Sequence, residues 1–351
     1  MRVLPTLLLM LLISAPAAAQ DRAGKKQRSV DSSGRKLVTP QTDKAIERGL
    51  KWLAKQQQPN GSFGSIGGYR ENVGVTALAG MAFLASGSTP DRGPYGREVT
   101  AVMNFLLSRA QPSGFITSEK PSQSHGPMYG HGFATLFLAE IYGTIERDDL
   151  RPKLSKAVRL IIASQNTDGG WRYSPNSRDA DLSVTVCQMM ALRAARNAGF
   201  AVAGETVEKC ILYLRKCQND DGGFRYQLEA ERESLFPRSA AAVVGFYSAG
   251  RYDGTEVESG LTYLGQFRPG SGLTNRNNYF YGHYYAVQAA WQAGGEHWFA
   301  WYPAIRDDLL PKQEPDGSWR DTTPFVGSAY ATAMACLVLQ MPNNLLPIFQ
   351  R

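Results

Sequence analysis

The sequence predicts an all-α fold, an α/α toroid in which six helical hairpin repeats form an outer and an inner ring of helices. Three observations lead to this prediction: a turn sequence recurs about every 50 residues, an amphipathic helical pattern precedes each copy, and an apolar helical pattern follows it. Neither helix of such a pair can bury its apolar surface alone, so the pairs must stack laterally. A closed ring is favoured over an open solenoid because it needs no polar cap at its ends.

The recurrent turn runs from a glutamine to a glycine and, in four copies, to an aromatic residue two positions later. Asp, Asn and Gly are turn-forming residues, and a Gln amide can hydrogen-bond the unpaired groups at a helix end. We therefore interpret the turn as a structural fastener between the two rings. Its copies are QQPNGSF at 57–63, QPSGF at 111–115, QNTDGGW at 165–171, QNDDGGF at 218–224, QFRPGSG at 266–272 and QEPDGSW at 313–319.

The helical patterns on the two sides of each turn differ in polarity. Those before the turns carry charge on one face and Leu, Ile or Val at spacings of three and four, as outer helices should. Those after the turns are nearly uncharged and rich in Ala, and five of them end on a glycine that can cap a helix. We expect outer helices within 45–56, 98–110, 153–165, 205–218, 256–266 and 304–313, and buried inner helices within 73–87, 129–143, 182–199, 238–250, 281–295 and 327–342.

The N-terminal residues differ from the repeats. Residues 1–19 are typical of a signal peptide, with Arg2, an apolar run at 7–13 and a small-residue cleavage site. The run is too short to span a bilayer, so we expect an exported protein, periplasmic or extracellular, with no transmembrane segment. Residues 20–41 form a flexible basic leader in this interpretation, and residues 42–349 form a single toroid domain.

The charge distribution argues against a nucleic-acid partner. The leader at 20–41 holds six basic and two acidic residues, and thus +4 of the formal net charge of +7. Its basic residues do not alternate with aromatic residues on one face, as they do in nucleic-acid-binding surfaces.

The four cysteines are expected to be free, buried thiols. Cys210 and Cys217 share one helical pattern and are separated by about 10 Å of helix rise, which exceeds the reach of a disulfide. Cys187 and Cys336 lie in apolar helical runs, where a thiol packs as a small apolar group. No pair has the spacing of a metal site, and the sequence predicts no cofactor.

The repeated Gln-x-x-x-Gly-x-Trp or Phe sequence resembles the repeat of the prenyltransferase and squalene-oxidase-repeat superfamily, which includes squalene-hopene cyclases and the β subunits of protein prenyltransferases. The resemblance covers essentially the whole chain after the leader. It implies that residues at the starts of the inner helices face a central cavity. The matching copies are Gln57-Gly61-Phe63, Gln165-Gly169-Trp171, Gln218-Gly222-Phe224 and Gln313-Gly317-Trp319.

A first candidate for chemistry is the stretch DADLSVT at 179–185, which resembles the DxDD stretch of class II triterpene cyclases. The resemblance places Asp181 at the proton donor and Asp179 at a neighbouring carboxylate. Leu182 departs from the pattern, because a partner carboxyl that tunes the acid is missing. An alternative role for Asp181 is to cap the inner helix, since Asp is a favoured residue before an apolar helical run.

A second candidate is the YGH sequence shared by repeats two and five. It contains Tyr129 and His131 in one repeat and Tyr281 and His283 in the other. In a closed ring these helices lie opposite each other, about 16 to 20 Å apart, which is too far for one metal to be held by both histidines. The sequence therefore predicts that Tyr129, His131, Tyr281 and His283 line the cavity.

The resemblance to prenyltransferase β subunits raises the question of zinc, which those proteins bind with Asp, Cys and His. The Asp-x-Cys part is absent here, because Ser183 stands at the position of the Cys after Asp181. We therefore predict no metal site.

A third feature is the density of aromatic residues in repeat five. Tyr279 and Tyr284 add to Tyr281 there, and aromatic faces can stabilise a carbocation or bind an apolar ligand. The same residues also suit a protein core, and residues that follow one another along a helix cannot all face inward.

Two classes of function remain open. The first is a ligand-binding or scaffold toroid of the cell exterior, with an apolar, isoprenoid-like ligand or a cell-envelope component as its partner. The second is a terpene or squalene cyclase-like enzyme, an isomerase or lyase, with Asp181 as its proton donor. The resemblance to triterpene cyclases implies two helical domains and about twice this length, which argues against a full cyclase. We therefore favour the first class and expect Tyr129, His131, Tyr279, Tyr281, His283 and Tyr284 to line the ligand site.

Overall fold

The computed structural model describes residues 34–64, 69–118, 126–271, 273, 278–321 and 327–350. The predicted signal peptide at 1–19 and the first part of the predicted leader, 20–33, lie outside these residues. Every named element in the described part of the chain is an α-helix or a short 3-10 helix. No helix there is long and apolar enough to cross a bilayer.

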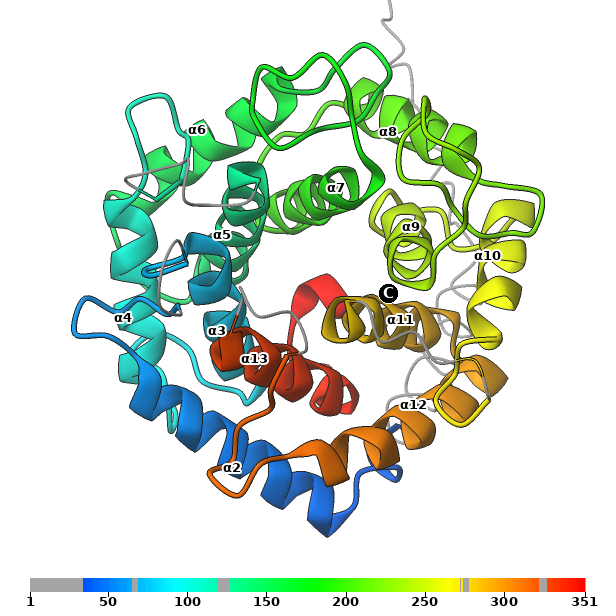
Figure 1. The fold of residues 1–351 in the computed structure, drawn as a ribbon. Coiled ribbons are helices and arrows are strands. Elements are labelled where there is room, and N and C mark those ends of the chain that lie inside the picture. Colours follow the sequence, from blue (N-terminus) through cyan, green and yellow to red (C-terminus); the bar gives the residue numbers. More distant parts are fainter. Residues whose placement is uncertain are drawn as a thin grey trace, which may run out of the picture.

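The helices alternate along the chain between an outer and an inner ring (Figure 1). This arrangement confirms the predicted α/α toroid of six helical hairpins. The outer ring consists of α2 (Pro40–Gln56), α4 (Gly96–Ser108), α6 (Leu150–Ala163), α8 (Gly204–Cys217), α10 (Thr255–Gly265) and α12 (Gly295–Leu309). The inner ring consists of α3 (Val73–Ala85), α5 (Pro127–Ile141), α7 (Leu182–Asn197), α9 (Phe236–Ser248), α11 (Tyr279–Ala293) and α13 (Gly327–Leu339).

Burial separates the two rings as the sequence predicts. Every residue of α3 is buried, whereas α2 buries Thr42, Ala45, Gly49, Leu50 and Leu53 and leaves its charged face in water. Each inner helix is surrounded by the two inner helices beside it in the ring, by an outer helix on one side and by the ring axis on the other. It therefore needs no polar face.

The ring is closed. The last inner helix, α13, packs against both α2 and α3, so the sixth hairpin contacts the first (Figure 1). The Gln313 side-chain amide adds a hydrogen bond to the Ala45 carbonyl of α2, 2.8 Å away. A closed ring is the architecture that leaves no terminal repeat to be capped.

The recurrent turn is a fastener, as predicted. The Gln165 amide donates to the Gly169 carbonyl at 2.8 Å, within its own turn, and to the Thr206 carbonyl at 2.9 Å, at the start of the next outer helix. Gln57, Gln218 and Gln313 make the same pair of bonds in their repeats. Each of these turns therefore adds a hydrogen bond to a carbonyl near the N-terminal end of the following outer helix and ties that helix to the turn.

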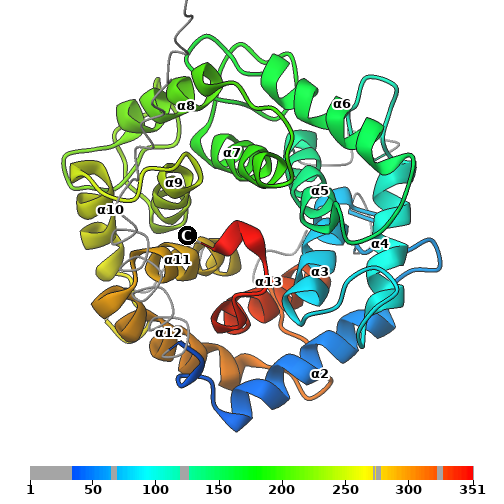
Figure 2. The same ribbon diagram turned by 180° about the vertical axis from the view of Figure 1, so that it is seen from behind.

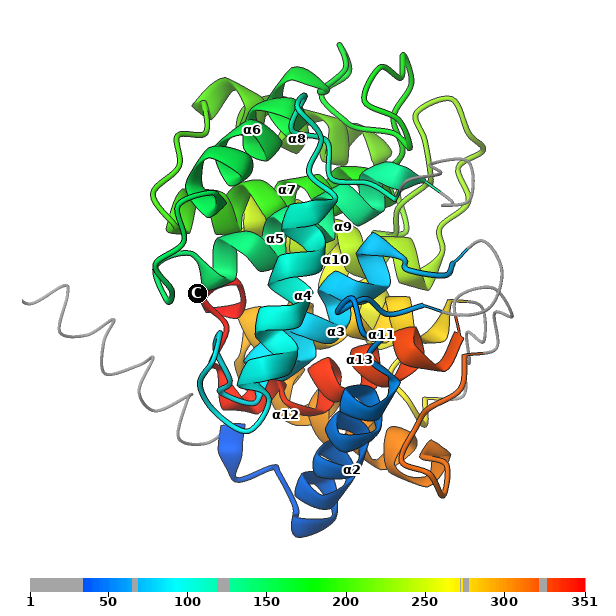
Figure 3. The same cartoon turned by 90° about the vertical axis from the view of Figure 1, so that its left-hand side faces the viewer.

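The C-terminal residues close one end of the ring (Figures 2 and 3). After α13 come two 3-10 helices, η3 (Met341–Asn343) and η4 (Pro347–Phe349). The Gln292 amide donates to the Phe349 carbonyl and the Arg193 guanidinium donates to the Gln350 carbonyl. The loops that lead into the inner helices α7 and α9 project from the opposite end (Figure 3).

Residues 34–41, assigned to the leader in the sequence analysis, pack on the domain. Thr39 caps α2 with its side chain in a capping box, the Arg35 guanidinium donates to the Asn343 side chain at 3.2 Å, and the Leu37 carbonyl accepts from Arg306. The basic, polar composition of 20–41 therefore did not reveal that its last residues contact the domain and cap the first helix. All four cysteines are free and buried, as expected.

Candidate ligand-binding cavity

A cavity of about 530 Å³ lies at the end of the ring where the inner helices begin. All six inner helices contribute to its wall, together with the loops that precede them. It reaches the surface at Leu235 and Asn278, which are both exposed. Six tyrosines line it, Tyr69, Tyr129, Tyr173, Tyr226, Tyr281 and Tyr330, beside the apolar residues Val75, Leu78, Phe133, Leu235, Pro237 and Met334. A mostly apolar wall with a few polar groups is usual for a small-molecule site.

Two of these tyrosines, Tyr173 and Tyr226, belong to a hydrogen-bonded network that sequence reasoning missed. Their hydroxyl oxygens are 2.6 Å apart, and the Arg172 guanidinium donates to the Tyr226 hydroxyl at 2.9 Å. Arg172 also lies over the ring of Tyr173, 4.3 Å from its centre. The signal was present in the sequence: Trp171-Arg172-Tyr173 and Phe224-Arg225-Tyr226 share an Arg-Tyr pair directly after the turn.

Asp181 is buried and serves as the N-cap of α7. Its carboxylate accepts one hydrogen bond from the Val184 backbone N–H at 2.9 Å and another from Arg172 at 2.9 Å. Burial raises the pKa of Asp181, although these two donors act in the opposite direction. The capping role expected as the alternative is confirmed, and Asp181 is fully buried and is not among the described residues that line the cavity.

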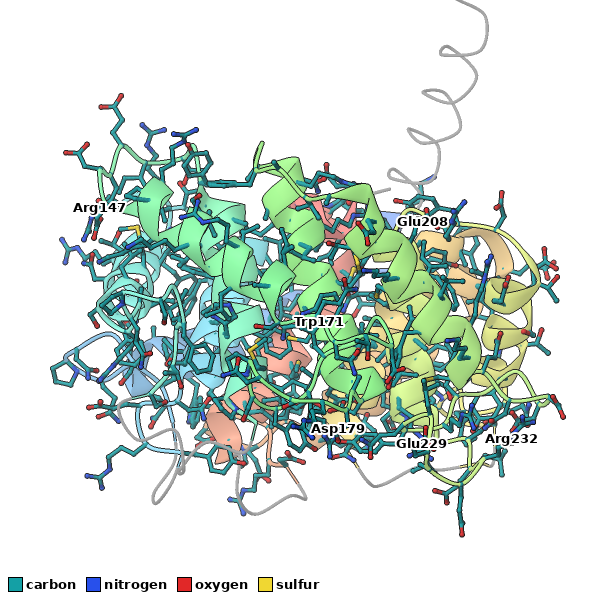
Figure 4. The ribbon with its side chains drawn as sticks, turned by 90° about the horizontal axis from the view of Figure 1, so that it is seen from above. Arg147, Trp171, Asp179, Glu208, Glu229 and Arg232 are labelled. Atoms are coloured by element: carbon teal, nitrogen blue, oxygen red, sulfur yellow. The ribbon has the colours of Figure 1, made fainter. Side chains whose placement is uncertain are left out.

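Asp179 lies at the surface, outside the cavity. Its side chain is 60% exposed and pairs with Arg172 Nε at 3.1 Å. The Gln227 amide donates to the same carboxylate oxygen, Oδ2, at 3.1 Å. Figure 4 shows Asp179 along the same edge of the molecule as Glu229 and Arg232. The two aspartates therefore hold one arginine from two sides and do not form an acid site open to a ligand.

His131 faces the outer ring rather than the cavity. Its Nδ1 accepts from the Ile116 backbone N–H at 3.1 Å, and its Nε2 is 3.3 Å from the Ala157 carbonyl of α6, to which it can donate. In repeats one, three, four and six, a hydroxyl group accepts the corresponding backbone N–H; Thr185, for example, accepts from Trp171. His131 thus takes the place of this hydroxyl acceptor in repeat two. Burial lowers the pKa of His131 to about 4.

His283 also faces outward. Its ring packs against Phe236 and Tyr279, with centroid distances of 5.1 and 4.6 Å, and against Trp301 of α12. The Tyr279 hydroxyl donates to Asp308, which is on the same outer helix. Burial lowers the pKa of His283 to about 3, so the imidazole is neutral at pH 7.

The structure therefore divides the predicted ligand-lining residues. Tyr129 and Tyr281 line the cavity, and burial raises the pKa of both, so their hydroxyls stay protonated. His131, His283 and Tyr279 point to the outer ring, and Tyr284 is fully buried in the core. The inner helices are buried on every side, so their sequences do not mark which face meets the cavity.

Among the described residues no group of three or more His, Cys, Asp or Glu side chains is arranged to hold a metal ion.

Replacing His283 by Phe tests its burial through the pH dependence of stability. The folded-state pKa is about 3, whereas an imidazole in the unfolded chain has a pKa of about 6.5. The unfolded state therefore binds the extra proton as the pH falls below about 6.5, and stability is lost in that direction. Between pH 7.5 and pH 5 we expect the wild type to lose about 2 kcal/mol more than His283→Phe, measured by urea unfolding. His297→Phe, which removes an exposed imidazole, is the control; equal losses in wild type and His283→Phe would contradict the burial.

A closed ring of six helical hairpins, with the C-terminal residues packed at one end and a cavity at the other, defines an α/α toroid protein. The chain belongs to the prenyltransferase alpha-alpha toroid domain family, whose model matches residues 37–156 and 131–264.

Solved structures share this fold at low sequence identity. The type II terpene cyclase MstE from Scytonema matches with a TM-score of 0.57 at 17% identity, over 87% of this chain and 99% of its own. The cellobiose 2-epimerase from Bacillus thermoamylovorans matches with a TM-score of 0.64 at 12% identity, over 85% of this chain and 98% of its own. The cellobiose 2-epimerase from Spirochaeta thermophila gives 0.63 at 12% identity, over 91% and 98%. A comparison with curated protein sequences finds no match.

Proposed function

We propose that this protein is an exported toroid that binds a small ligand with an apolar body in the tyrosine-lined cavity and leaves it chemically unchanged. The observation that carries the proposal is the position of Asp181, the acid that the resemblance to triterpene cyclases indicates. Asp181 is buried behind the cavity wall with both carboxylate oxygens bonded, whereas the cavity itself is lined by aromatic and apolar side chains.

The size and shape of the cavity support a ligand of small-molecule size. Its volume of about 530 Å³ falls within the usual range of such sites, roughly 300 to 1,000 Å³. The C-terminal residues close the far end of the ring, so the ligand enters and leaves at the end where the inner helices begin.

An isoprenoid-like chain is the first ligand class to test, and a cell-envelope component is the other. One solved toroid of similar fold, a variant of MstE, holds geranylgeranyl dihydroxybenzoate as its substrate. The apolar wall formed by Leu78, Phe133 and Met334 suits the same kind of chain. Export is part of the proposal and is supported by the signal-peptide pattern at 1–19.

Ser183→Trp tests whether the cavity is the binding site. Ser183 lines the cavity from the first turn of α7, so an indole at this position fills the space that a ligand needs. We expect geranylgeraniol or squalene to bind the wild type and to lose at least about tenfold in affinity in the variant, measured by calorimetry. Ser108→Trp, at an exposed position of α4, is the control and should bind like the wild type. Equal affinity in all three proteins would place the ligand elsewhere.

The competing function is a cyclase that uses Asp181 as its acid, and the raised pKa of Asp181 is the observation in its favour. Asp181→Asn removes the acid and keeps a residue that caps helices well. We expect no isoprenoid product from wild type or variant by mass spectrometry, and the same ligand affinity in both. A product made by the wild type and lost in Asp181→Asn would overturn the proposed function.

A further inference from the structure

The wall of the cavity has an apolar side and a polar side. The apolar side comes from α3 and α13, through Val75, Leu78 and Met334. The polar side comes from α7 and α9, through Ser183 and Arg238. A ligand that matches both sides is amphipathic. It binds in one orientation, because burying its apolar part against the charged Arg238 is less favourable in free energy than burying it against α3.

Arg238 is the one charged side chain among the described residues that line the cavity. It is 13% exposed, and its position is fixed by backbone groups. The Nε donates to the Phe224 carbonyl at 3.0 Å, and one terminal nitrogen, Nη2, donates to the Glu233 carbonyl and to its carboxylate. The other terminal nitrogen, Nη1, has no hydrogen bond to any of the described residues, so a held guanidinium still has donors to offer.

The other polar groups of the cavity wall, including Asn72 at the N-cap of α3, are donors as well. Asn72 Oδ1 accepts from the Val75 backbone N–H at 3.0 Å, which leaves the amide Nδ2 as the group that a ligand can meet. The hydroxyls of Ser183 and Tyr281 can also donate. No carboxylate is among the described lining residues, so the polar side of the cavity favours a ligand group that accepts hydrogen bonds.

We propose that the ligand is a single-chain amphiphile whose anionic head group, a carboxylate or a phosphate, binds Arg238 while its apolar chain lies against α3 and α13. This inference rests on the proposed function, because it names the ligand class of the same cavity. A guanidinium held by backbone carbonyls matches the paired oxygens of such a head group at little entropic cost.

Glu233 is the one acidic residue of the described part of the chain that forms an ion pair with Arg238. Its side chain is 67% exposed, so water screens the pair and weakens it. A bound head group and Glu233 compete for the same cation. Glu233→Gln should therefore tighten the binding of an anionic amphiphile and leave that of a neutral one unchanged.

Four ligands that share one dodecyl chain separate the contribution of the head group to the affinity from that of the chain. The probes are dodecanoate, dodecyl phosphate, dodecanol and dodecyltrimethylammonium, titrated calorimetrically into the full chain below their micelle concentrations. We expect the two anions to bind at least about tenfold more tightly than dodecanol, and the ammonium to bind most weakly. The ratio between dodecanoate and dodecyl phosphate then identifies the preferred head group.

Two arginine variants assign the preference to its residue. Arg238→Gln should reduce the affinity for both anions to that for dodecanol, whereas Arg232→Gln, at an exposed arginine of the loop before α9, should behave like the wild type. Arg238→Lys keeps the positive charge but lacks the planar guanidinium that binds two oxygens at once, so it should retain part of the preference for anions. This variant keeps the test valid if Arg238→Gln does not fold. Equal binding of anions and dodecanol by the wild type, or an unchanged preference in a folded Arg238→Gln, overturns this inference alone. Absence of binding by all four probes overturns the proposed function with it.

Discussion

Replacing Gly169 by Ala should lower the free energy of unfolding by at least about 3 kcal/mol, because two costs combine at this position. The residue has a φ of +96°, a conformation that costs an L-residue about 1–2 kcal/mol. A Cβ at Gly169 would also lie 2.2 Å from the Lys209 carbonyl oxygen of α8. This oxygen belongs to a helix backbone and cannot move aside, so the turn would be pushed away from the next outer helix.

Gly199→Ala separates the two costs. Gly199 has a φ of +87° and nothing within 4 Å of its Cβ position, so its replacement adds backbone strain without a collision. We expect Gly199→Ala to cost about 1–2 kcal/mol in urea unfolding, clearly less than Gly169→Ala. Equal costs would mean that the close approach of the turn to α8 contributes nothing to stability.

The same close approach occurs at most of the recurrent turns. A Cβ at Gly61 would lie 2.2 Å from the Ala101 carbonyl oxygen, and one at Gly222 would lie 2.5 Å from that of Ser259. Gly270, in repeat five, has a similar φ of +85° but nothing within 4 Å. Repeat five is also the copy whose turn sequence, QFRPGSG, lacks the aromatic ending. The sequence difference therefore corresponds to a turn that does not rest on the following outer helix.

The ring architecture could be predicted from the sequence because each of its causes is local. The turn residues repeat at a constant spacing, and the polar face of α2 contrasts with the fully buried α3. A helix that is apolar all round has to lie inside, and six such helices with short connections leave few arrangements. The position of Gln313, which bonds α2 across the ring closure, follows from the same repeat.

The cavity could be predicted only in part, because its wall combines residues from many separate segments. Tyr129 and Tyr281 belong to it, but His131 and His283, two positions further along their helices, face the opposite way. A helix turns by about 100° per residue, so a side chain two positions further along points about 200° away, to the opposite face. An inner helix without a polar face gives no sign in its sequence of which side meets the axis. Tyr173 and Tyr226 lie in loops, where no periodicity applies.

Asp181→Ala is expected to destabilise the protein by about 3–5 kcal/mol, the cost of breaking a buried ion pair by removing one partner. Asp181 is fully buried, and its loss removes the N-cap of α7 and leaves Arg172 with the exposed Asp179 as its remaining carboxylate. Asp179→Ala removes the other partner of the same arginine at a side chain that is 60% exposed, and we expect a change within about 0.5 kcal/mol. Burial thus predicts a large difference between two aspartates that are two residues apart.

The comparison also separates a structural role of Asp181 from a catalytic one. A carboxyl kept for acid chemistry is usually a burden on stability, and its replacement by Asn or Ala then leaves the protein as stable as before or more so. Here the raised pKa of Asp181 shows that burial disfavours its charge, yet Arg172 and the helix end depend on that charge being present. Urea unfolding of Asp181→Ala, Asp181→Asn and Asp179→Ala, with Arg172→Met in a double-mutant cycle, measures this dependence. If Asp181→Ala unfolds like the wild type, the capping role is refuted and the acid becomes the better explanation of why a carboxyl is buried there.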